Sequence, residues 1–195
     1  MRVLVVYESM YGNTHAVAEG VGSGLRATAD VTVVPVSRVH ANDLIGVDLL
    51  VVGGPTHVHG VTTARSREAA IAAASKPGAE PSLDPDAEGP GLREWLDGLD
   101  VSGVSKAAAF DTRFDGPAIF TGRASRGIAH RLRGLGLELT APPESFLVDR
   151  DNHLAPGAND TAVAWGELLA RSLANATGAH GTSTPRSHRP EETSG

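Results

Sequence analysis

The sequence predicts an α/β fold in which a five-stranded parallel sheet carries helices on both faces. Short runs of apolar, β-branched residues alternate along the chain with segments whose apolar residues recur at helical spacing. This alternation is typical of doubly wound sheets, and five strands in this rhythm favour the order 2-1-3-4-5. Ligands of such sheets bind outside the carboxyl ends of the strands. We therefore expect the functional residues after the first, third and fourth strands.

Each expected strand is a short apolar run that ends at turn-forming residues. The strands cover residues 3–7, 31–36, 48–52, 105–110 and, in two pieces, 137–139 and 145–148. Pro142 and Pro143 separate the two pieces of the last strand. Because proline cannot donate a hydrogen bond to a neighbouring strand, we place this last strand at an edge of the sheet.

Helical periodicity or composition predicts five helices between and after these strands. They lie in residues 15–27, 65–74, 92–99, 124–135 and 160–173. The second is predicted by its alanine content, and Asp160 is the expected N-cap of the last.

Two segments outside these elements differ in composition from the rest. Residues 76–91 are rich in proline, glycine and acidic residues and offer almost nothing to bury, so we expect a flexible surface insert. Residues 176–195 consist mainly of small, polar and histidine residues, so we expect a disordered tail. Residues 1–175 are then one domain that includes the insert.

Composition excludes several classes of function. A formal net charge of −6 argues against a general nucleic-acid binder. The sequence has no cysteine, which excludes disulfides, thiolate catalysis and cysteine-held zinc or iron–sulfur clusters. Electron transfer would therefore need an organic cofactor. No apolar run approaches the roughly 20 residues that span a bilayer, and the N-terminus reads as a strand, so we expect a cytoplasmic protein without membrane association.

The segment after the first strand, residues 8–14, has the features of an anion-binding loop. It runs directly into a helix, whose first backbone N–H groups and dipole favour an anion. Ser9, Asn13 and Thr14 can donate hydrogen bonds, and Gly12 permits a close backbone approach. The loop holds no lysine or arginine, so it would bind a phosphate through neutral donors alone. The alternative is an ordinary strand-to-helix turn capped by Thr14.

Three segments together resemble the flavodoxin-like family. YESMYGNT, residues 7–14, resembles the phosphate-binding loop of flavodoxins. GGPTHVHG, residues 53–60, resembles their flavin-contacting loop, and DTRF, residues 111–114, with the later Thr121 and Gly122, resembles the third loop of flavodoxin-domain proteins. Each segment follows the expected strand, and the resemblance covers about residues 1–175.

The resemblance implies a flavodoxin-like fold that binds flavin mononucleotide (FMN). It places Ser9, Met10, Tyr11, Gly12, Asn13 and Thr14 around the phosphate. It places Pro55, Thr56, His57, Val58, His59 and Gly60 on one side of the flavin ring, and Asp111, Thr112, Arg113 and Phe114 on the other. It also makes Gly60, or the peptide before it, the candidate that meets the proton-bearing N5 of the reduced ring.

Some residues depart from the usual flavodoxin pattern. The second segment lacks the tryptophan or tyrosine that stacks on the ring in many flavodoxins, and Phe114 is the sole aromatic of the third. Tyr11 stands where a smaller hydroxyl residue is common. The Glu8 carboxylate would oppose a bound phosphate unless it points away. Arg113 could favour a reduced, anionic ring, pair with a substrate carboxylate, or be a solvated loop arginine.

The sequence leaves three functional hypotheses. The first is an electron carrier between redox partner proteins, a reductase and an acceptor. The second is an FMN-dependent NAD(P)H:quinone oxidoreductase, and the third is a flavin-free binding or regulatory module that keeps the fold. We expect no metal site, because His57 and His59 have no third ligand at suitable spacing.

Overall fold

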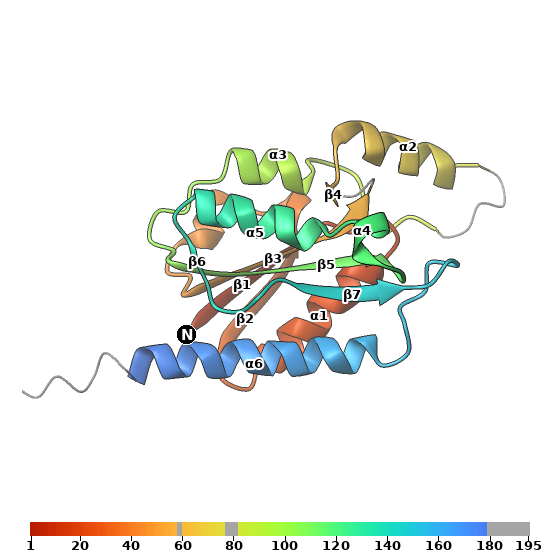
Figure 1. Cartoon of the computed structure of the whole chain (residues 1–195). Helices are drawn as coiled ribbons and strands as arrows, with labels where there is room; N and C mark the ends of the chain where they lie inside the picture. The colour runs from red at the N-terminus through yellow and green to blue at the C-terminus, as the bar shows by residue number, and fades with distance from the viewer. Residues whose placement is uncertain (58–59, 77–81, 179–195) are drawn as a thin grey trace, which may run out of the picture.

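The computed structural model of the chain describes residues 1–57, 60–76 and 82–178. Its centre is a parallel sheet with helices on both faces (Figure 1). Across the sheet run β2 (Asp30–Pro35), β1 (Arg2–Tyr7), β3 (Leu49–His57), β5 (Lys106–Phe114) and β6 (Glu138–Leu139), with β7 (Glu144–Val148) also paired to β5. This confirms the predicted doubly wound order, with the last strand in two pieces around the two prolines.

The side chains of the central strands alternate between two hydrophobic cores. Val3 and Val5 of β1 belong to one core, and Leu4 and Val6 to the other. All four are at most 1% exposed, as expected for a strand that helices cover on both faces. The continuous apolar run at residues 3–7 is therefore a buried parallel strand.

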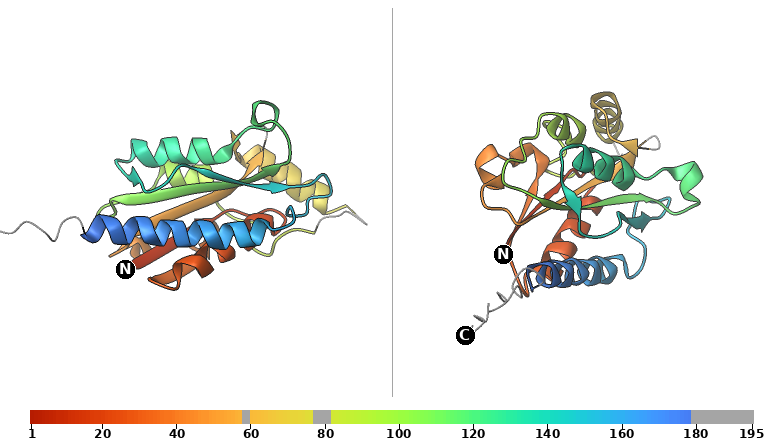
Figure 2. Two further views of the ribbon diagram at one scale, coloured as in Figure 1. Left: turned by 60° about the horizontal axis from the view of Figure 1, so that its bottom comes forward. Right: turned by 60° about the vertical axis from the view of Figure 1, so that its left-hand side comes forward.

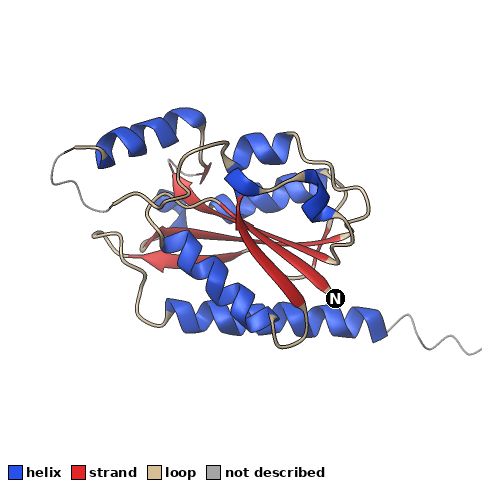
Figure 3. Cartoon of the chain, turned by 180° about the vertical axis from the view of Figure 1, so that it is seen from behind, coloured by secondary structure: helices blue, strands red, loops and turns tan. Residues whose placement is uncertain are grey.

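Two pairs of helices build these cores (Figure 2). On one face lie α1 (Asn13–Leu25) and α6 (Ala158–Gly178), and on the other lie α3 (Leu92–Asp97) and α5 (Ala124–Gly134). Figures 1 and 3 show α2 (Ala64–Ala74) set apart from the sheet on the α3 side. Within the described residues, no helix is both long and apolar enough to cross a membrane.

The starts of α6 and α1 differ from the prediction, and three short helical turns were not predicted. Helix α6 begins at Ala158, so Asp160 lies inside its first turn and is not its N-cap. Helix α1 begins at Asn13 after Gly12, two residues earlier than periodicity indicated. Short turns that carry no period were not predicted; they are η1 (Val36–Arg38), η2 (Ala41–Leu44) and α4 (Ala118–Thr121).

Glycines let α1 and α6 approach until backbone touches backbone. An added Cβ at Gly24 of α1 would overlap the carbonyl oxygen of Val163 in α6. An added Cβ at Gly166 of α6 would overlap the carbonyl oxygen of Val21 in α1. The two helices are thus held at a separation that only glycine permits.

Two strands continue beyond their predicted ends. Strand β3 was expected to end at residue 52 but reaches His57, because β4 (Gly60–Val61) returns antiparallel and pairs His57 with Gly60. Strand β5 was expected to end at residue 110 but reaches Phe114, which pairs with Val148 of β7. The second and third sequence motifs therefore lie largely on strand ends and not in loops.

The segment expected to be a surface insert is in part packed against the domain. Asp84 and Ala87 are 6% and 5% exposed, so the expectation that it buries almost nothing is wrong for residues 84 and 87. Residues 77–81 of this segment, and residues 179–195 of the expected tail, lie outside the described residues.

Candidate functional site

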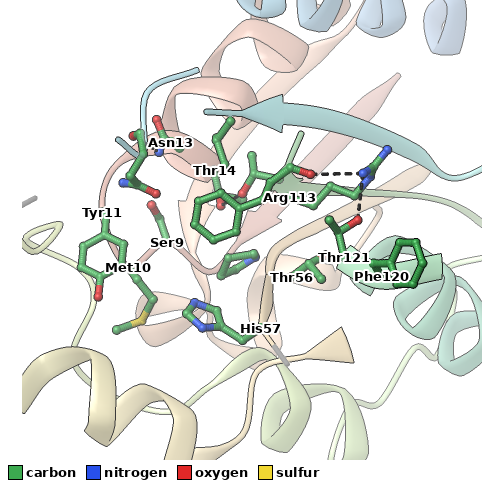
Figure 4. A pocket seen from close by; sticks show the side chains of 15 residues that line it. Ser9, Met10, Tyr11, Asn13, Thr14, Thr56, His57, Arg113, Phe120 and Thr121 are labelled. Atoms are coloured by element: carbon green, nitrogen blue, oxygen red, sulfur yellow. Dashed lines mark hydrogen bonds between the residues drawn. The ribbon is translucent and has the colours of Figure 1, made fainter. Parts of the chain in front are cut away.

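A cleft of about 350 Å³ opens at the carboxyl ends of β1, β3 and β5 (Figure 4). All three predicted motifs line it, through Ser9, Met10, Tyr11, Asn13, Thr14, Pro55, Thr56, His57, Thr112, Arg113 and Phe114. Of the other predicted residues, Gly12, Gly60 and Asp111 do not line it, and Val58 and His59 lie outside the described residues. Sequence reasoning missed three further lining residues, which are Phe120, Val148 and Asn152, and it placed Thr121 in the third motif without giving it a role.

The turn between β1 and α1 presents backbone N–H groups at a helix start. Gly12 precedes the helix with φ +87°, a left-handed conformation that glycine adopts without strain, and its N–H donates to Ser9 Oγ at 3.0 Å. The first hydrogen bond of the helix runs from Ala16 N to Gly12 O at 2.9 Å. The N–H groups of the three residues between, 13–15, therefore have no acceptor inside the helix, a geometry that suits the binding of an anion through neutral donors.

Two side chains of this turn fix it to neighbouring segments. The hydroxyls of Thr14 and Thr112 lie 2.7 Å apart and are buried, which joins α1 to β5. Asn13 Nδ2 donates to the carbonyl oxygen of Asn152 at 2.7 Å. In a hydroxyl pair one O–H donates to the other, so the second hydroxyl keeps its hydrogen for a further acceptor. The pair thus orients a neutral donor beside the N–H groups.

Asp111 lies behind the cleft, where it caps another helix. Its Oδ2 accepts hydrogen bonds from Thr56 Oγ1 at 3.0 Å and from Ser125 N at 2.8 Å. Thr56 Oγ1 in turn accepts from Ala124 N at 2.8 Å. The two side chains satisfy the first N–H groups of α5 and tie that helix to β3 and β5.

Arg113 is folded against the protein, so its interpretation as a solvated loop arginine is wrong. It is 9% exposed. Its Nη1 donates to the carbonyl oxygens of Phe114 and Gly116 at 3.2 and 2.9 Å, and to Thr121 Oγ1 at 3.0 Å (Figure 4). The guanidinium therefore holds the turn that carries α4 at the rim of the cleft.

Aromatic side chains line the open part of the cleft. Phe114 and Phe120 are 51% and 73% exposed although they are large and apolar, which is typical of a binding surface. Phe120 escaped prediction because α4 is a single turn without periodicity. On the β3 side, burial lowers the pKa of His57 below its ordinary value of about 6.5, so its imidazole is neutral at about pH 7.

The Glu8 carboxylate points away from the cleft, as a phosphate site requires. Its Oε2 accepts from Thr62 Oγ1 at 2.6 Å and from Leu92 N at 2.7 Å, while its other oxygen has no partner among the described residues. Burial raises the pKa of this carboxyl above its ordinary value. Glu8 therefore joins β1 to the β4 and α3 segments and does not face the anion site.

Replacing Glu8 with glutamine should make stability less dependent on pH. A carboxyl whose folded-state pKa is raised contributes stability below its unfolded pKa, and this contribution is lost as pH rises through the folded value. We expect the melting temperature of Glu8→Gln, minus that of the wild type, to increase from about pH 4 to about pH 8. Thermal unfolding across this range measures it.

The exposed Glu138→Gln is the matched control for loss of one carboxylate. Its melting temperature should follow the wild-type curve. If the difference in melting temperature between Glu8→Gln and wild type stays constant with pH, the pKa of Glu8 is not raised by folding.

The comparisons with known proteins agree with this geometry. The family model described as flavodoxin matches residues 5–152. No curated protein matches the sequence. Among solved structures, a flavodoxin from the domain Archaea is 20% identical, with 89% of this chain and 99% of that chain covered and a TM-score of 0.63. Oxidised flavodoxin 1 from Bacillus cereus is 18% identical, with 88% and 98% covered and a TM-score of 0.59.

The same fold also occurs as part of longer proteins. The rubredoxin oxygen:oxidoreductase of Desulfovibrio gigas is 18% identical, with 89% of this chain but 36% of that chain covered and a TM-score of 0.59. At these identities the structural likenesses concern the fold, whereas the family model spans most of the chain. The chain belongs to the flavodoxin family, whose cofactor is FMN.

Proposed function

We propose that this chain is a cytoplasmic electron carrier that holds FMN in the cleft and passes electrons between redox partner proteins. The phosphate would lie at the start of α1, against the turn of residues 9–14. The ring would lie between the end of β3 and the segment that runs from β5 into α4. The observation that carries the proposal is the set of neutral N–H donors at the start of α1, which opens into a cleft lined with aromatic side chains.

The phosphate end of the cleft fits the group chemically. The N–H groups of residues 13–15 and the Thr14–Thr112 hydroxyl pair offer donors, and no carboxylate is among the described lining residues, since Glu8 points away. The one arginine among the described lining residues is Arg113, and its guanidinium is bonded to the α4 turn. A doubly negative phosphate would therefore be held by oriented dipoles and hydrogen bonds.

The ring end fits a planar aromatic group. Phe114 and Phe120 offer ring faces for stacking on the flavin. Phe120 lies outside the sequence motifs and adds an aromatic that they lack. Pro55 and Val148 add apolar surface that excludes water. When bound, the flavin accepts and releases the electrons, and the protein sets its potential through hydrogen bonds, dryness and charge.

Gly60 is the proposed partner of N5 through its own carbonyl or the peptide before it. Gly60 pairs with His57 in the β3–β4 hairpin, and its φ lies outside the left-handed region. A Cβ added there would meet no described atom within 4 Å, so the space beside Gly60 is open. Neutral His57, on the paired strand, places no charge beside it.

Titration of the apoprotein with FMN tests the proposal. We expect quenching of flavin fluorescence and a shifted visible spectrum at micromolar protein, with one FMN per chain. Unchanged fluorescence would overturn it in favour of a flavin-free module.

A second assay separates the carrier from a quinone oxidoreductase. The FMN-loaded protein is mixed with NADH or NADPH and a soluble quinone, with and without an added flavodoxin reductase. A carrier should oxidise the nicotinamide only when the reductase is present. Rapid oxidation by the chain alone would assign it to the quinone oxidoreductases instead.

A further inference from the structure

Residues 82–88, here called the strap, run behind the phosphate loop formed by residues 9–14. Asp84 N donates to the carbonyl oxygen of Met10 at 2.8 Å. Asp84 Oδ2 lies 3.3 Å from Nδ1 of His15, in the first turn of α1. One residue of the strap therefore contacts the chain on both sides of the Gly12 turn.

The strap fixes the position of Asp84 itself. The Asp84 side chain is 1% exposed, and its Oδ1 accepts from Asp86 N at 2.9 Å in a turn that Ala87 N closes onto Asp84 O at 3.0 Å. Asp86 forms an ion pair with Arg38 on η1. The aspartate thus has a single orientation, and the ion pair to Arg38 holds the strap at a point away from the loop.

Apolar contacts join the strap to the loop as well. Met10 packs in a small core with Ala70 of α2 and Ala87 of the strap, and Tyr11 and Leu83 pack against the same core. Two side chains of the phosphate loop are therefore turned toward the strap and α2. Both residues also line the cleft, so the strap contacts the wall of the proposed phosphate site directly.

A carboxylate behind a phosphate site needs an explanation, because its charge opposes that of the phosphate. The loop holds no lysine or arginine, so its affinity depends on how well its N–H groups are oriented before binding. Asp84 fixes the Met10 carbonyl and the His15 ring, which also stacks on Tyr7 with centroids 4.7 Å apart. The contacts with Met10 and His15 therefore help to orient the N–H groups of the loop.

We propose that Asp84 is a positioning residue for phosphate: from the strap it presets the loop so that its N–H groups converge on a phosphate group. The inference rests on the proposed function. It assigns a binding role to the strap and predicts that the strap controls selectivity for FMN over riboflavin, which lacks the phosphate.

The experiment measures dissociation constants of FMN and riboflavin for wild type, Asp84→Ala and Asp84→Asn by fluorescence quenching. Asp84→Ala should weaken FMN about tenfold, which is ~1.4 kcal/mol, and leave riboflavin within about twofold. Asp84→Asn keeps an acceptor for Asp86 N and should restore most of the FMN affinity. Asp97→Asn, which removes an exposed pair with Arg131 far from the loop, is the matched control and should bind both flavins normally.

Each other outcome has a defined meaning. Equal weakening of both flavins, or no weakening of either, would overturn the positioning role. Wild type that binds neither flavin would instead refute the proposed function. If Asp84→Ala does not fold, His15→Ala replaces it, since that side chain is 39% exposed. Selective loss of FMN would then support the inference, and unchanged selectivity would overturn it.

Discussion

Thr14→Val should weaken FMN binding between about 10- and 100-fold. Valine has nearly the shape of threonine but cannot donate or accept a hydrogen bond. The change removes the partner of the buried Thr112 hydroxyl and ends the relay that leaves one O–H hydrogen for the phosphate. Adding Asn13→Ala frees the Asn152 carbonyl oxygen and removes a second donor. The double variant should retain no FMN at micromolar protein.

Fluorescence titration and the flavin content after purification measure this effect. Thr32→Val, on the exposed side of β2, is the matched control for the same chemical change and should keep wild-type affinity. Unchanged FMN affinity in the double variant would discredit the start of α1 as the phosphate site.

Gly166→Ala should destabilise the fold by about 3 kcal/mol or more. The added Cβ would overlap the Val21 carbonyl oxygen, and backbone atoms cannot move aside as a flexible side chain can. Helices α1 and α6 would have to separate, which opens the core around Trp165 and Leu169. Urea unfolding followed by circular dichroism measures the change.

Gly134→Ala is the matched control, because this glycine also lies in a helix but its Cβ would meet no atom within 4 Å. Alanine has the higher helix propensity, so this variant, at the last residue of α5, should be at least as stable as wild type. If Gly166→Ala unfolds at the wild-type urea concentration, the close helix contact is not as described.

Local sequence patterns predicted the sheet because its central strands are buried on both faces. A continuous apolar run such as residues 3–7 is readily recognised as a buried strand. The alternation of such strands with helices is compatible with few sheet topologies. The same reasoning located the turn that we propose as the phosphate site, since Gly12 and neutral donors between a strand and a helix are a local signal.

The features that sequence patterns did not predict depend on pairing between strands that are distant in the sequence or on contacts outside a local window. Strand β3 reaches His57 through β4, and β5 reaches Phe114 through β7, and neither partner is visible in a local window. Composition predicted that the strap buries almost nothing. Asp84 is nevertheless buried, because it contacts the phosphate loop on both sides of Gly12, and composition does not show such long-range contacts. Phe120 was missed because a single turn has no period.

Helices α1 and α5 both start at the carboxyl edge of the sheet, but only α5 is capped by side chains. The carboxylate of Asp111, together with Thr56, already neutralises the positive end of α5. Helix α1 has no side-chain cap and no acidic residue in its first turn, so its first N–H groups stay available to a ligand. We therefore expect an elongated ligand with one anionic end to bind with that end at α1. Asp111 sets this orientation by capping α5, although it does not line the cleft.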